Sequence, residues 1–228
     1  MEIDVVQKVM KVNDDLAAGV RERLRAAGVA AVNLISAPGS GKTSLIEGAL
    51  RALAGRVRVG VIEGDPDTTL DAERIAACGV PVVQIQTAGG CHLEANLVLR
   101  AIERLPLGDI DLLIVENVGN LVCPVDFDLG ETARAAIVST AEGHDKPAKY
   151  PKLFRTTDTV VLNKIDLLPY VDFDEARFTE YVHTINPKAR VLRTSCRTGD
   201  GIDAWADWLA GVCTLRTPSL ATCEGPPS

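Results

Sequence analysis

The sequence predicts an α/β fold in which a mainly parallel sheet is flanked by helices and preceded by an N-terminal helix. Short apolar runs rich in Val, Ile and Leu alternate along the chain with segments of helical periodicity. Strands joined through helices form parallel sheets that are covered on both faces. The length of 228 residues, with 46% hydrophobic side chains, suits one domain with a sizeable core.

An amphipathic helix over residues 3–27 comes first, ended by Gly28, because apolar side chains recur there near helical spacing. We expect this helix to pack on the domain; the alternative is a docking helix for a partner. Strands are expected over residues 32–35, 57–62, 82–86, 111–116, 135–139, 159–163 and 191–194. Helices are expected over residues 42–53, 69–77, 92–104, 174–185 and 202–212.

Three segments follow from this order: the helix at 1–28, a nucleotide-binding domain at 29–214 and a tail at 215–228. The tail is rich in Pro, Ser, Thr and Gly, which predicts disorder. The net charge of −7 argues against non-specific binding to nucleic acid or to a membrane. The start of the chain lacks a signal-peptide layout and no apolar run could span a bilayer, so a cytoplasmic location is expected.

A phosphate-binding loop is predicted at residues 36–43, Ser-Ala-Pro-Gly-Ser-Gly-Lys-Thr, because it joins an apolar strand to a helix. Its backbone N–H groups and the helix N-terminus would cradle the phosphates. Lys42 would contact the β- and γ-phosphates, and Thr43 would bind Mg²⁺. Ser36 stands where the usual pattern has Gly. The phosphate-binding residues expected here are Gly39, Ser40, Gly41, Lys42, Thr43 and Ser44.

Acids at the ends of two further strands are candidate catalytic residues together with Lys42. Glu116 ends an apolar strand and is followed by Gly119, a spacing that suits an acid for Mg²⁺ and a glycine N–H for the γ-phosphate. Asp65 ends another strand and would either act on the Mg²⁺ side or orient the attacking water. Asp67 and Asp71 have the simpler interpretation of charging the start of the next helix.

Guanine recognition is predicted at Asn163-Lys164-Ile165-Asp166, which follows a buried strand. The Asp166 carboxylate can accept two hydrogen bonds from guanine, whereas adenine lacks that pair of donors and would leave the carboxylate unpaired. Lys164 can lay its alkyl stem along the base. Ser195 and Cys196, at the end of a later strand, are placed to offer backbone N–H groups to the base carbonyl. GTP and GDP are therefore the expected ligands.

A metal site is suggested by Cys91 and His92, which follow Gly89-Gly90 at an expected helix start, together with Cys123. The helix N-terminus would lower the pKa of Cys91. Thiolate and imidazole suit Zn²⁺ or Ni²⁺, and three ligands leave one position open or shared with a second subunit. The alternative is buried thiols and a surface imidazole. Cys123 lies shortly after Gly119, so nucleotide hydrolysis would move a metal ligand.

These motifs together resemble the family of the hydrogenase maturation factor HypB, nickel-inserting GTPases of the dimerising (SIMIBI) P-loop class. The resemblance rests on the phosphate loop, Glu63-Gly64-Asp65, residues 90–93, the run Glu-Asn-Val-Gly-Asn-Leu-Val-Cys-Pro at 116–124, and residues 163–170. It implies GTP hydrolysis by a homodimer, with Cys91, His92 and Cys123 holding Ni²⁺ or Zn²⁺ near the dimer interface.

The same resemblance implies a HypA-type metallochaperone partner and delivery of nickel to the [NiFe]-hydrogenase large subunit. Some members carry an N-terminal cysteine motif or a histidine-rich tract. Neither occurs before residue 30, so nickel storage is not expected. Residues 145–152 also match the family, and their simplest interpretation is a Pro-rich surface loop.

Three other functions are compatible with parts of the pattern. A urease-accessory nickel GTPase is disfavoured because that group uses a Cys-Pro-His metal motif, and Cys123-Pro124 is followed here by Val125. A nucleotide-sensing module would bind GTP and metal without coupling them. A small-molecule kinase rarely needs guanine selectivity, so Asn163-Lys164-Ile165-Asp166 speaks against it.

Overall fold

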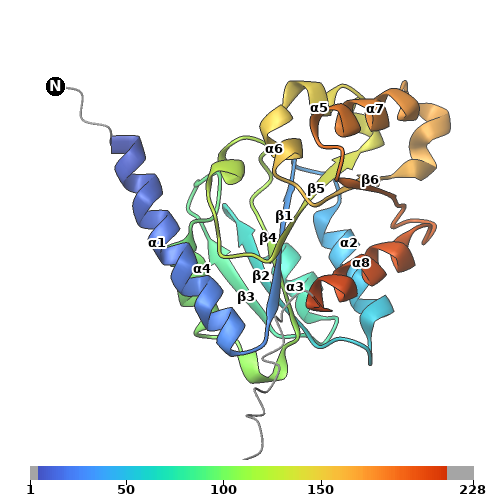
Figure 1. The fold of residues 1–228 in the computed structure, drawn as a ribbon. Coiled ribbons are helices and arrows are strands. Elements are labelled where there is room, and N and C mark those ends of the chain that lie inside the picture. The colour runs from blue at the N-terminus through green and yellow to red at the C-terminus, as the bar shows by residue number, and fades with distance from the viewer. Residues whose placement is uncertain (1–4, 215–228) are drawn as a thin grey trace, which may run out of the picture.

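A seven-stranded parallel sheet forms the centre of the protein, whose computed structural model describes residues 5–214 (Figure 1). The strand order is β3-β2-β4-β1-β5-β6-β7, and each neighbouring pair is parallel. This confirms the predicted fold class. The strands are β1 Ala30–Ser36, β2 Val59–Asp65, β3 Val82–Gln86, β4 Leu112–Glu116, β5 Ala133–Ser139, β6 Thr159–Asn163 and β7 Arg190–Arg193.

Helices cover both faces of the sheet (Figure 1). Helices α2 Lys42–Leu53, α3 Leu70–Ala76 and α8 Ile202–Thr214 pack on one face, around a core that includes Leu45 and Trp205. The other face carries α1 Val5–Ala26, α4 Ala95–Ile102, α6 Pro151–Arg155 and α7 Glu175–Ile185, with α5 Lys146–Lys149 beside α7. Alternate residues of each central strand enter the two cores, as buried parallel strands require. Short 3₁₀ turns complete the chain at Leu107–Asp109, Cys123–Asp126, Thr140–Glu142 and Ile165–Tyr170.

Helix α1 packs on the domain, as the first of the two interpretations predicts. Ala17, Val20 and Leu24 are buried and repeat at helical spacing along its inner face. The buried side chain of Asn13 adds two hydrogen bonds, donating to the Asp128 carbonyl at 2.8 Å and accepting from the Ala95 N–H at 2.9 Å. Helix α1 is therefore fixed both to the start of α4 and to the loop before β5.

Two local predictions were wrong. Helix α4 begins at Ala95 rather than at residue 92, because Glu94 is extended and residues 91–94 form a loop. The segment 145–152 contains two short helices instead of a loop, and both have proline in their first turn, where its missing N–H costs nothing. The predicted tail at 215–228 lies outside the described residues. Among residues 5–214, no helix is long and apolar enough to cross a membrane.

Candidate functional site

The carboxyl edge of the sheet gathers the predicted nucleotide residues. The phosphate loop follows β1, Asp65 and Glu116 end β2 and β4, and Asn163 ends β6. Because the strands are parallel, their carboxyl ends meet at one edge, where ligands bind in open α/β sheets. The alternation of strands and helices thus brings together residues that lie far apart in the sequence.

Lys42 forms a hydrogen bond to the first residue of the phosphate loop. The Lys42 ammonium group donates to the Ser36 hydroxyl at 3.0 Å, so the serine in place of the usual glycine supplies an acceptor. Burial lowers the pKa of Lys42, and the negative charge of Glu116 opposes that effect. Gly41 has φ 98°, and an added Cβ would lie 2.6 Å from the amide nitrogen of Asn163. Only glycine suits that position.

Two buried glutamates face α2 side by side. Glu116 accepts a hydrogen bond from the Thr43 hydroxyl at 3.0 Å, and Glu63 is its register partner on β2. Burial raises the pKa of Glu116 to about 7. Burial and the neighbouring charge of Glu116 raise the pKa of Glu63 to about 8. Among the described residues, the second carboxylate oxygen of each has no hydrogen-bond partner. Such paired carboxylate oxygens suit a hard cation such as Mg²⁺.

Asp65 shares this acidic cluster with Glu63 and Asp71, with one oxygen of each within 4.8 Å of the others. One Asp65 oxygen also accepts the N–H groups of Asp67 and Thr68, which fixes the turn after β2. Asp71 does more than charge the start of α3, since it belongs to the cluster and pairs with Arg74 at 2.9 Å. Sequence reasoning missed Glu63, although the two-residue period of a strand puts it on the same face as Asp65.

A cavity of about 430 Å³ lies beside the phosphate loop. Asn163 donates to the Ser40 carbonyl at 2.9 Å, and Lys164 donates to the Gly39 carbonyl at 2.7 Å. These bonds fix the Asn163 turn against the loop. The residues that line the cavity are Gly41, Ser44, Glu47, Arg51, Asn163, Lys164, Asp166, Leu167, Cys196 and Arg197.

Ser195 contacts the base-recognition motif through its side chain. Its hydroxyl donates to the Asp166 carboxylate at 2.6 Å. The expectation that its backbone N–H faces a base carbonyl was wrong, because that N–H donates to the Asp200 carbonyl at 2.9 Å. Cys196 does line the cavity. Ser195 therefore orients the carboxylate that the sequence assigns to guanine.

Glu142, which sequence reasoning also missed, supports the phosphate loop from the end of β5. Its carboxylate accepts the Ser40 hydroxyl at 2.7 Å and the Ser139 N–H at 2.8 Å. Lys146 of α5 lies 3.5 Å from its other oxygen. The segment 145–152 thus has a physical role that its sequence did not indicate, since its first lysine neutralises the glutamate that holds the loop.

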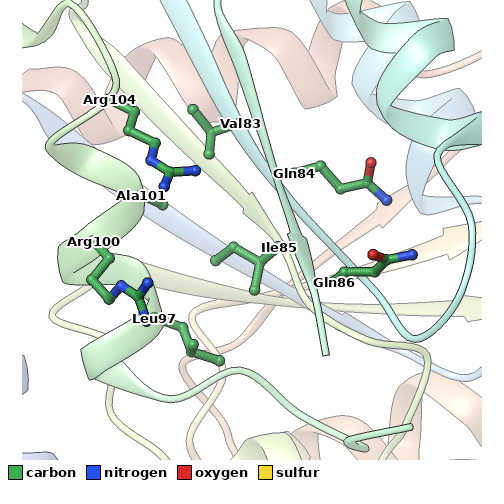
Figure 2. A pocket seen from close by; sticks show the side chains of 8 residues that line it. All are labelled: Val83, Gln84, Ile85, Gln86, Leu97, Arg100, Ala101 and Arg104. Atoms are coloured by element: carbon green, nitrogen blue, oxygen red, sulfur yellow. The ribbon is translucent and has the colours of Figure 1, made fainter. Parts of the chain in front are cut away.

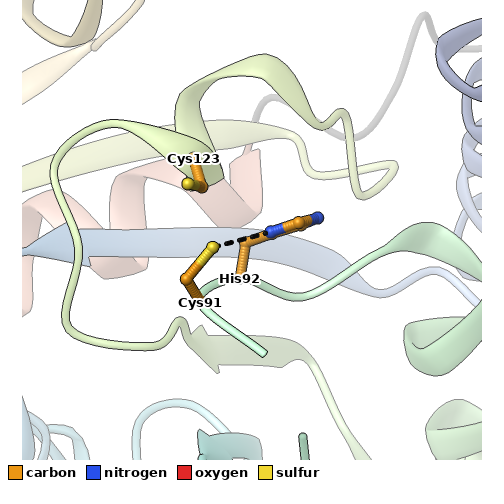
Figure 3. Close-up of side chains that lie close together, drawn as sticks. All are labelled: Cys91, His92 and Cys123. Atoms are coloured by element: carbon orange, nitrogen blue, oxygen red, sulfur yellow. Dashed lines mark hydrogen bonds between the residues drawn. The ribbon is translucent and has the colours of Figure 1, made fainter. Parts of the chain in front are cut away.

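The three predicted metal ligands converge in space (Figure 3). Donor atoms of Cys91, His92 and Cys123 all lie within 4.8 Å of one another, and the Cys91 sulfur lies 3.5 Å from Nδ1 of His92. Bonds of about 2.3 Å to sulfur and 2.0–2.1 Å to nitrogen would join atoms this far apart after a small closing movement. This donor set fits Ni²⁺ or Zn²⁺.

The surroundings of this cluster hold the imidazole in place. The Phe127 ring stacks on His92 at 3.9 Å between centroids. Within residues 5–214 the buried Nε2 of His92 has no hydrogen-bond partner, and the Glu94 carboxylate lies 3.7 Å away. The expected lowering of the Cys91 pKa was wrong. No helix begins at Cys91, and hydrogen bonding to Cys123, followed by burial, raises the pKa of that thiol.

The nucleotide and metal regions are joined by the segment after β4. Gly119 lies against the phosphate loop, where an added Cβ would be 3.0 Å from the Pro38 Cα. Asn120 donates to the Cys91 carbonyl at 3.3 Å, and Cys123 follows three residues later. One short segment therefore contacts both the phosphate loop and the metal-ligand loop.

A separate cavity of about 260 Å³ lies between the edge strand β3 and α4 (Figure 2). Arg100 of α4 and Arg104, in the turn after that helix, extend over it, and Val83 and Ile85 face it from β3. None of the nucleotide or metal residues described above lines this cavity. The candidate site is therefore the carboxyl edge of the sheet and the metal cluster beside it.

Comparison with known proteins places these features in a family context. Residues 30–193 match the family model described as the CobW/HypB/UreG nucleotide-binding domain. The hydrogenase maturation factor HypB of Azotobacter chroococcum is 47% identical over 207 residues, which cover 91% of this chain and 68% of that relative.

Solved structures of HypB proteins are also similar to this chain. The chain is similar to HypB from Archaeoglobus fulgidus, with a TM-score of 0.83, 40% identity, and coverage of 89% of this chain and 99% of that one. It is also similar to HypB from Helicobacter pylori in complex with nickel, with a TM-score of 0.85, 34% identity, and coverage of 89% and 95%. The signal recognition particle 54 kDa protein of Aeropyrum pernix, at 15% identity and a TM-score of 0.57 over 82% and 49% of the two chains, shares the fold alone.

Proposed function

This chain belongs to the HypB hydrogenase maturation factors of the CobW/HypB/UreG family and is a GTP hydrolase, and from that premise we propose that it inserts nickel into a [NiFe]-hydrogenase large subunit. GTP hydrolysis gates the transfer. The single observation that carries the proposal is the segment 116–123, which begins at a buried acid beside Thr43 and ends at Cys123 in the metal cluster. Because the segment is short, a backbone displacement at Glu116 would also displace Cys123.

In the proposed mechanism, water attacks the γ-phosphate in line. Lys42 binds the β- and γ-phosphates, and the Gly119 N–H binds the γ-phosphate. Thr43 and Glu116 would hold Mg²⁺, which would supply positive charge to the phosphate oxygens. Asp65 would either join them on the Mg²⁺ side or orient the attacking water. Catalysis is then mainly positioning and electrostatic stabilisation, because the protein forms no covalent bond to phosphate.

Guanine binds in the 430 Å³ cavity, with Asp166 accepting hydrogen bonds from the base. The Ser195 hydroxyl at 2.6 Å fixes the carboxylate, and a fixed carboxylate loses less conformational freedom when it binds. Lys164 covers one face of the base with its alkyl stem. Cys196 remains a candidate for the base carbonyl.

Nickel is the cargo in this proposal, held by Cys91, His92 and Cys123. The softness of two thiolates and an imidazole supports nickel or zinc over magnesium or calcium. Three ligands leave one position for a ligand of a second copy or of the receiving protein, which a homodimer with a HypA-type partner would provide. A bound cation would also lower the raised pKa of Cys91, since it favours the thiolate.

Two alternatives remain distinguishable from this proposal. In a urease-accessory GTPase a histidine follows Cys-Pro, whereas Val125 occupies that position here and is buried in the core with Ile35 and Ala136. A nucleotide-sensing module would bind both ligands without coupling between them. The first alternative is disfavoured by the burial of Val125, and the second is tested below.

The test is a Ni²⁺ titration of the protein with Mg²⁺–GDP and with a non-hydrolysable GTP analogue. Thiolate-to-metal absorption reports the affinity. We expect the two affinities to differ by about fivefold or more. Cys123→Ala should bind less metal and keep GTP, whereas the exposed Cys78→Ala should behave as wild type. Equal affinities in wild type would refute gating and favour the uncoupled module. Unchanged metal stoichiometry in Cys123→Ala would remove Cys123 from the site.

A further inference from the structure

Glu116 and the residue after it, Asn117, face opposite sides of the sheet. Glu116 faces α2 and the phosphate loop, where it accepts from the Thr43 hydroxyl. The Asn117 N–H continues the strand by donating to the Leu34 carbonyl at 3.1 Å, so the next side chain points to the other face. Asn117 is 1% exposed. One peptide unit therefore connects the nucleotide side of the sheet to the side that carries the metal cluster.

The amide oxygen of Asn117 holds the loop that carries two of the metal ligands. It accepts the Leu93 N–H at 3.1 Å and the Val118 N–H at 3.0 Å. Leu93 directly follows His92, and its side chain is fully buried. A displacement of Asn117 would therefore move the backbone next to His92 or break a buried hydrogen bond, and both are costly.

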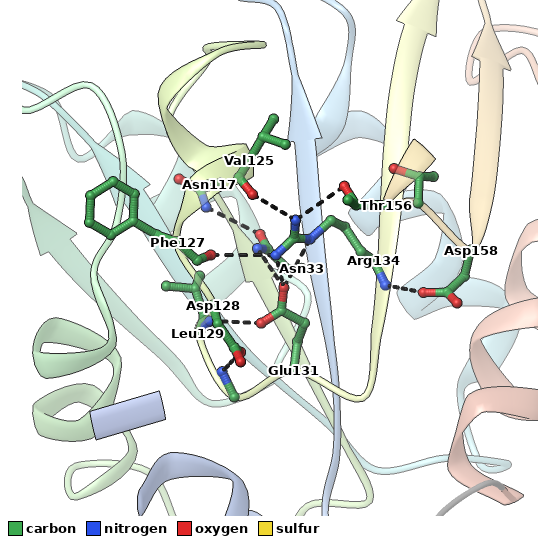
Figure 4. Close-up of polar contacts among 12 residues, drawn as sticks. Asn33, Asn117, Val125, Phe127, Asp128, Leu129, Glu131, Arg134, Thr156 and Asp158 are labelled. Atoms are coloured by element: carbon green, nitrogen blue, oxygen red, sulfur yellow. Dashed lines mark hydrogen bonds and ion pairs between the residues drawn. The ribbon is translucent and has the colours of Figure 1, made fainter. Parts of the chain in front are cut away.

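The amide nitrogen of Asn117 begins a second chain of contacts (Figure 4). It donates to the Asn33 amide oxygen at 3.2 Å, and Asn33 in turn donates to the Glu131 carboxylate at 3.3 Å. Glu131 forms an ion pair with Arg134 at 2.6 Å, and both side chains are nearly buried. Charged groups in such an enclosed network keep fixed positions because breaking one contact leaves a buried charge unpaired.

Arg134 completes this chain at the segment that bears Cys123. Its guanidinium donates to the Val125 carbonyl at 3.0 Å and to the Phe127 carbonyl at 3.4 Å (Figure 4). Phe127 stacks on His92. The two arms from Asn117 therefore end on the two segments whose approach forms the metal cluster.

We propose that Asn117 is a positioning residue that transmits the nucleotide state from the Glu116 side of the sheet to both metal-bearing segments. This inference rests on the proposed nucleotide and metal sites and concerns an event distinct from nickel gating, the movement of residues 91–93 and 121–127. The hydrogen-bond partners of the Asn117 side chain are Asn33, Leu93 and Val118, none of which is a predicted nucleotide or metal ligand. The effect of Asn117 arises because its amide oxygen accepts from Leu93, its amide nitrogen donates to Asn33, and its backbone directly follows Glu116.

The test measures amide hydrogen-exchange rates in peptides covering residues 91–97 and 121–127, with saturating Mg²⁺–GDP or a GTP analogue. In wild type, we expect rates in both segments to differ by about fivefold or more between the nucleotides. Asn117→Ala should lose the difference in both segments. Asn33→Ala should lose it only in residues 121–127, because the Leu93 bond remains. The control Asn186→Ala removes a comparable asparagine at the end of α7 and should keep both differences.

Several results would overturn the inference. One is a wild-type protein in which neither segment responds to the nucleotide. Another is an Asn117→Ala variant whose exchange rates respond to the nucleotide as strongly as those of wild type. If Asn120→Ala also loses that response, transmission belongs to the Asn120–Cys91 contact instead. Exchange rates rather than end points are compared, so faster basal exchange in a variant does not hide the ratio. If Asn117→Ala fails to fold, Asn33→Ala tests the second arm.

The Ni²⁺ titration of the same variants separates this inference from the proposed function. If wild-type nickel affinity is the same with both nucleotides while the exchange response exists and needs Asn117, gating fails and the positioning role stands. If nickel affinity depends on the nucleotide equally in wild type and Asn117→Ala, gating stands and the positioning role is refuted.

Discussion

Replacing Glu63 by glutamine should change how protein stability depends on pH. Glu63 is 2% exposed and lies beside Glu116 across the β2–β4 pair. Burial, then the charges of Glu116 and Asp65, raises its pKa from 4.5 to about 8. Glutamine keeps the shape of the side chain but cannot ionise. The substitution therefore isolates the cost of that one negative charge.

The sign follows from proton linkage. Between pH 4.5 and about 8 the folded protein retains a proton on Glu63 that the unfolded chain has released. The free energy of unfolding therefore falls as pH rises through that window and levels off above the folded-state pKa. Glu63→Gln lacks this contribution, so its stability relative to wild type should increase from acidic to mildly alkaline pH.

The pKa shift of Glu63 sets an upper limit on this gain in stability. The difference between about 8 and 4.5 is 3.5 pKa units. At about 1.4 kcal/mol per unit the upper limit is about 5 kcal/mol. Glu63 and Glu116 repel each other, so part of the shift belongs to the pair and is relieved when either keeps its proton. We therefore expect the relative gain to reach about 2–3 kcal/mol.

Urea unfolding of nucleotide-free protein in EDTA, at about pH 5 and about pH 8, measures this gain. The control is Glu180→Gln, which removes an exposed glutamate on α7. Its stability relative to wild type should change little between the two pH values. A Glu63→Gln curve parallel to that of wild type at both pH values would show that burial of Glu63 does not hold a proton there.

Three further changes have defined outcomes. Asp166→Asn should weaken GTP binding by about tenfold or more and favour xanthosine triphosphate, because the amide reverses one hydrogen-bonding role; competition binding measures both affinities. Gly41→Ala should abolish nucleotide binding measured by calorimetry, since its Cβ would clash with Asn163 at 2.6 Å and the backbone is left-handed; wild-type affinity would contradict the close approach. Arg134→Ala should lower the unfolding free energy by about 3–5 kcal/mol, because it leaves the buried Glu131 carboxylate without its ion-pair partner. A loss below about 1 kcal/mol in urea unfolding would show that this ion pair does not stabilise the fold.

The sequence by itself determined the elements and the motifs that local chemistry specifies. Apolar runs predicted the seven strands. The phosphate loop and the Asn163 motif were identified because strand, turn and helix signals surround them within a few residues. The order of Glu116, Gly119 and Cys123 indicated a link between nucleotide and metal before any contact was known. Residues 145–152 and the start of α4 were predicted wrongly because short helices and caps depend on packing more than on pattern.

Only the tertiary structure decided which side chains meet. Glu63 became a partner of Glu116 through strand register, and Asn117 joined Asn33, 84 residues earlier in the chain, through strand order. The convergence of Cys91 and His92 with Cys123 likewise depends on how the loops before α4 and after β4 fold over the sheet edge. The physical reason is that a strand's period fixes the face on which each residue lies, whereas its neighbour on that face depends on the whole topology.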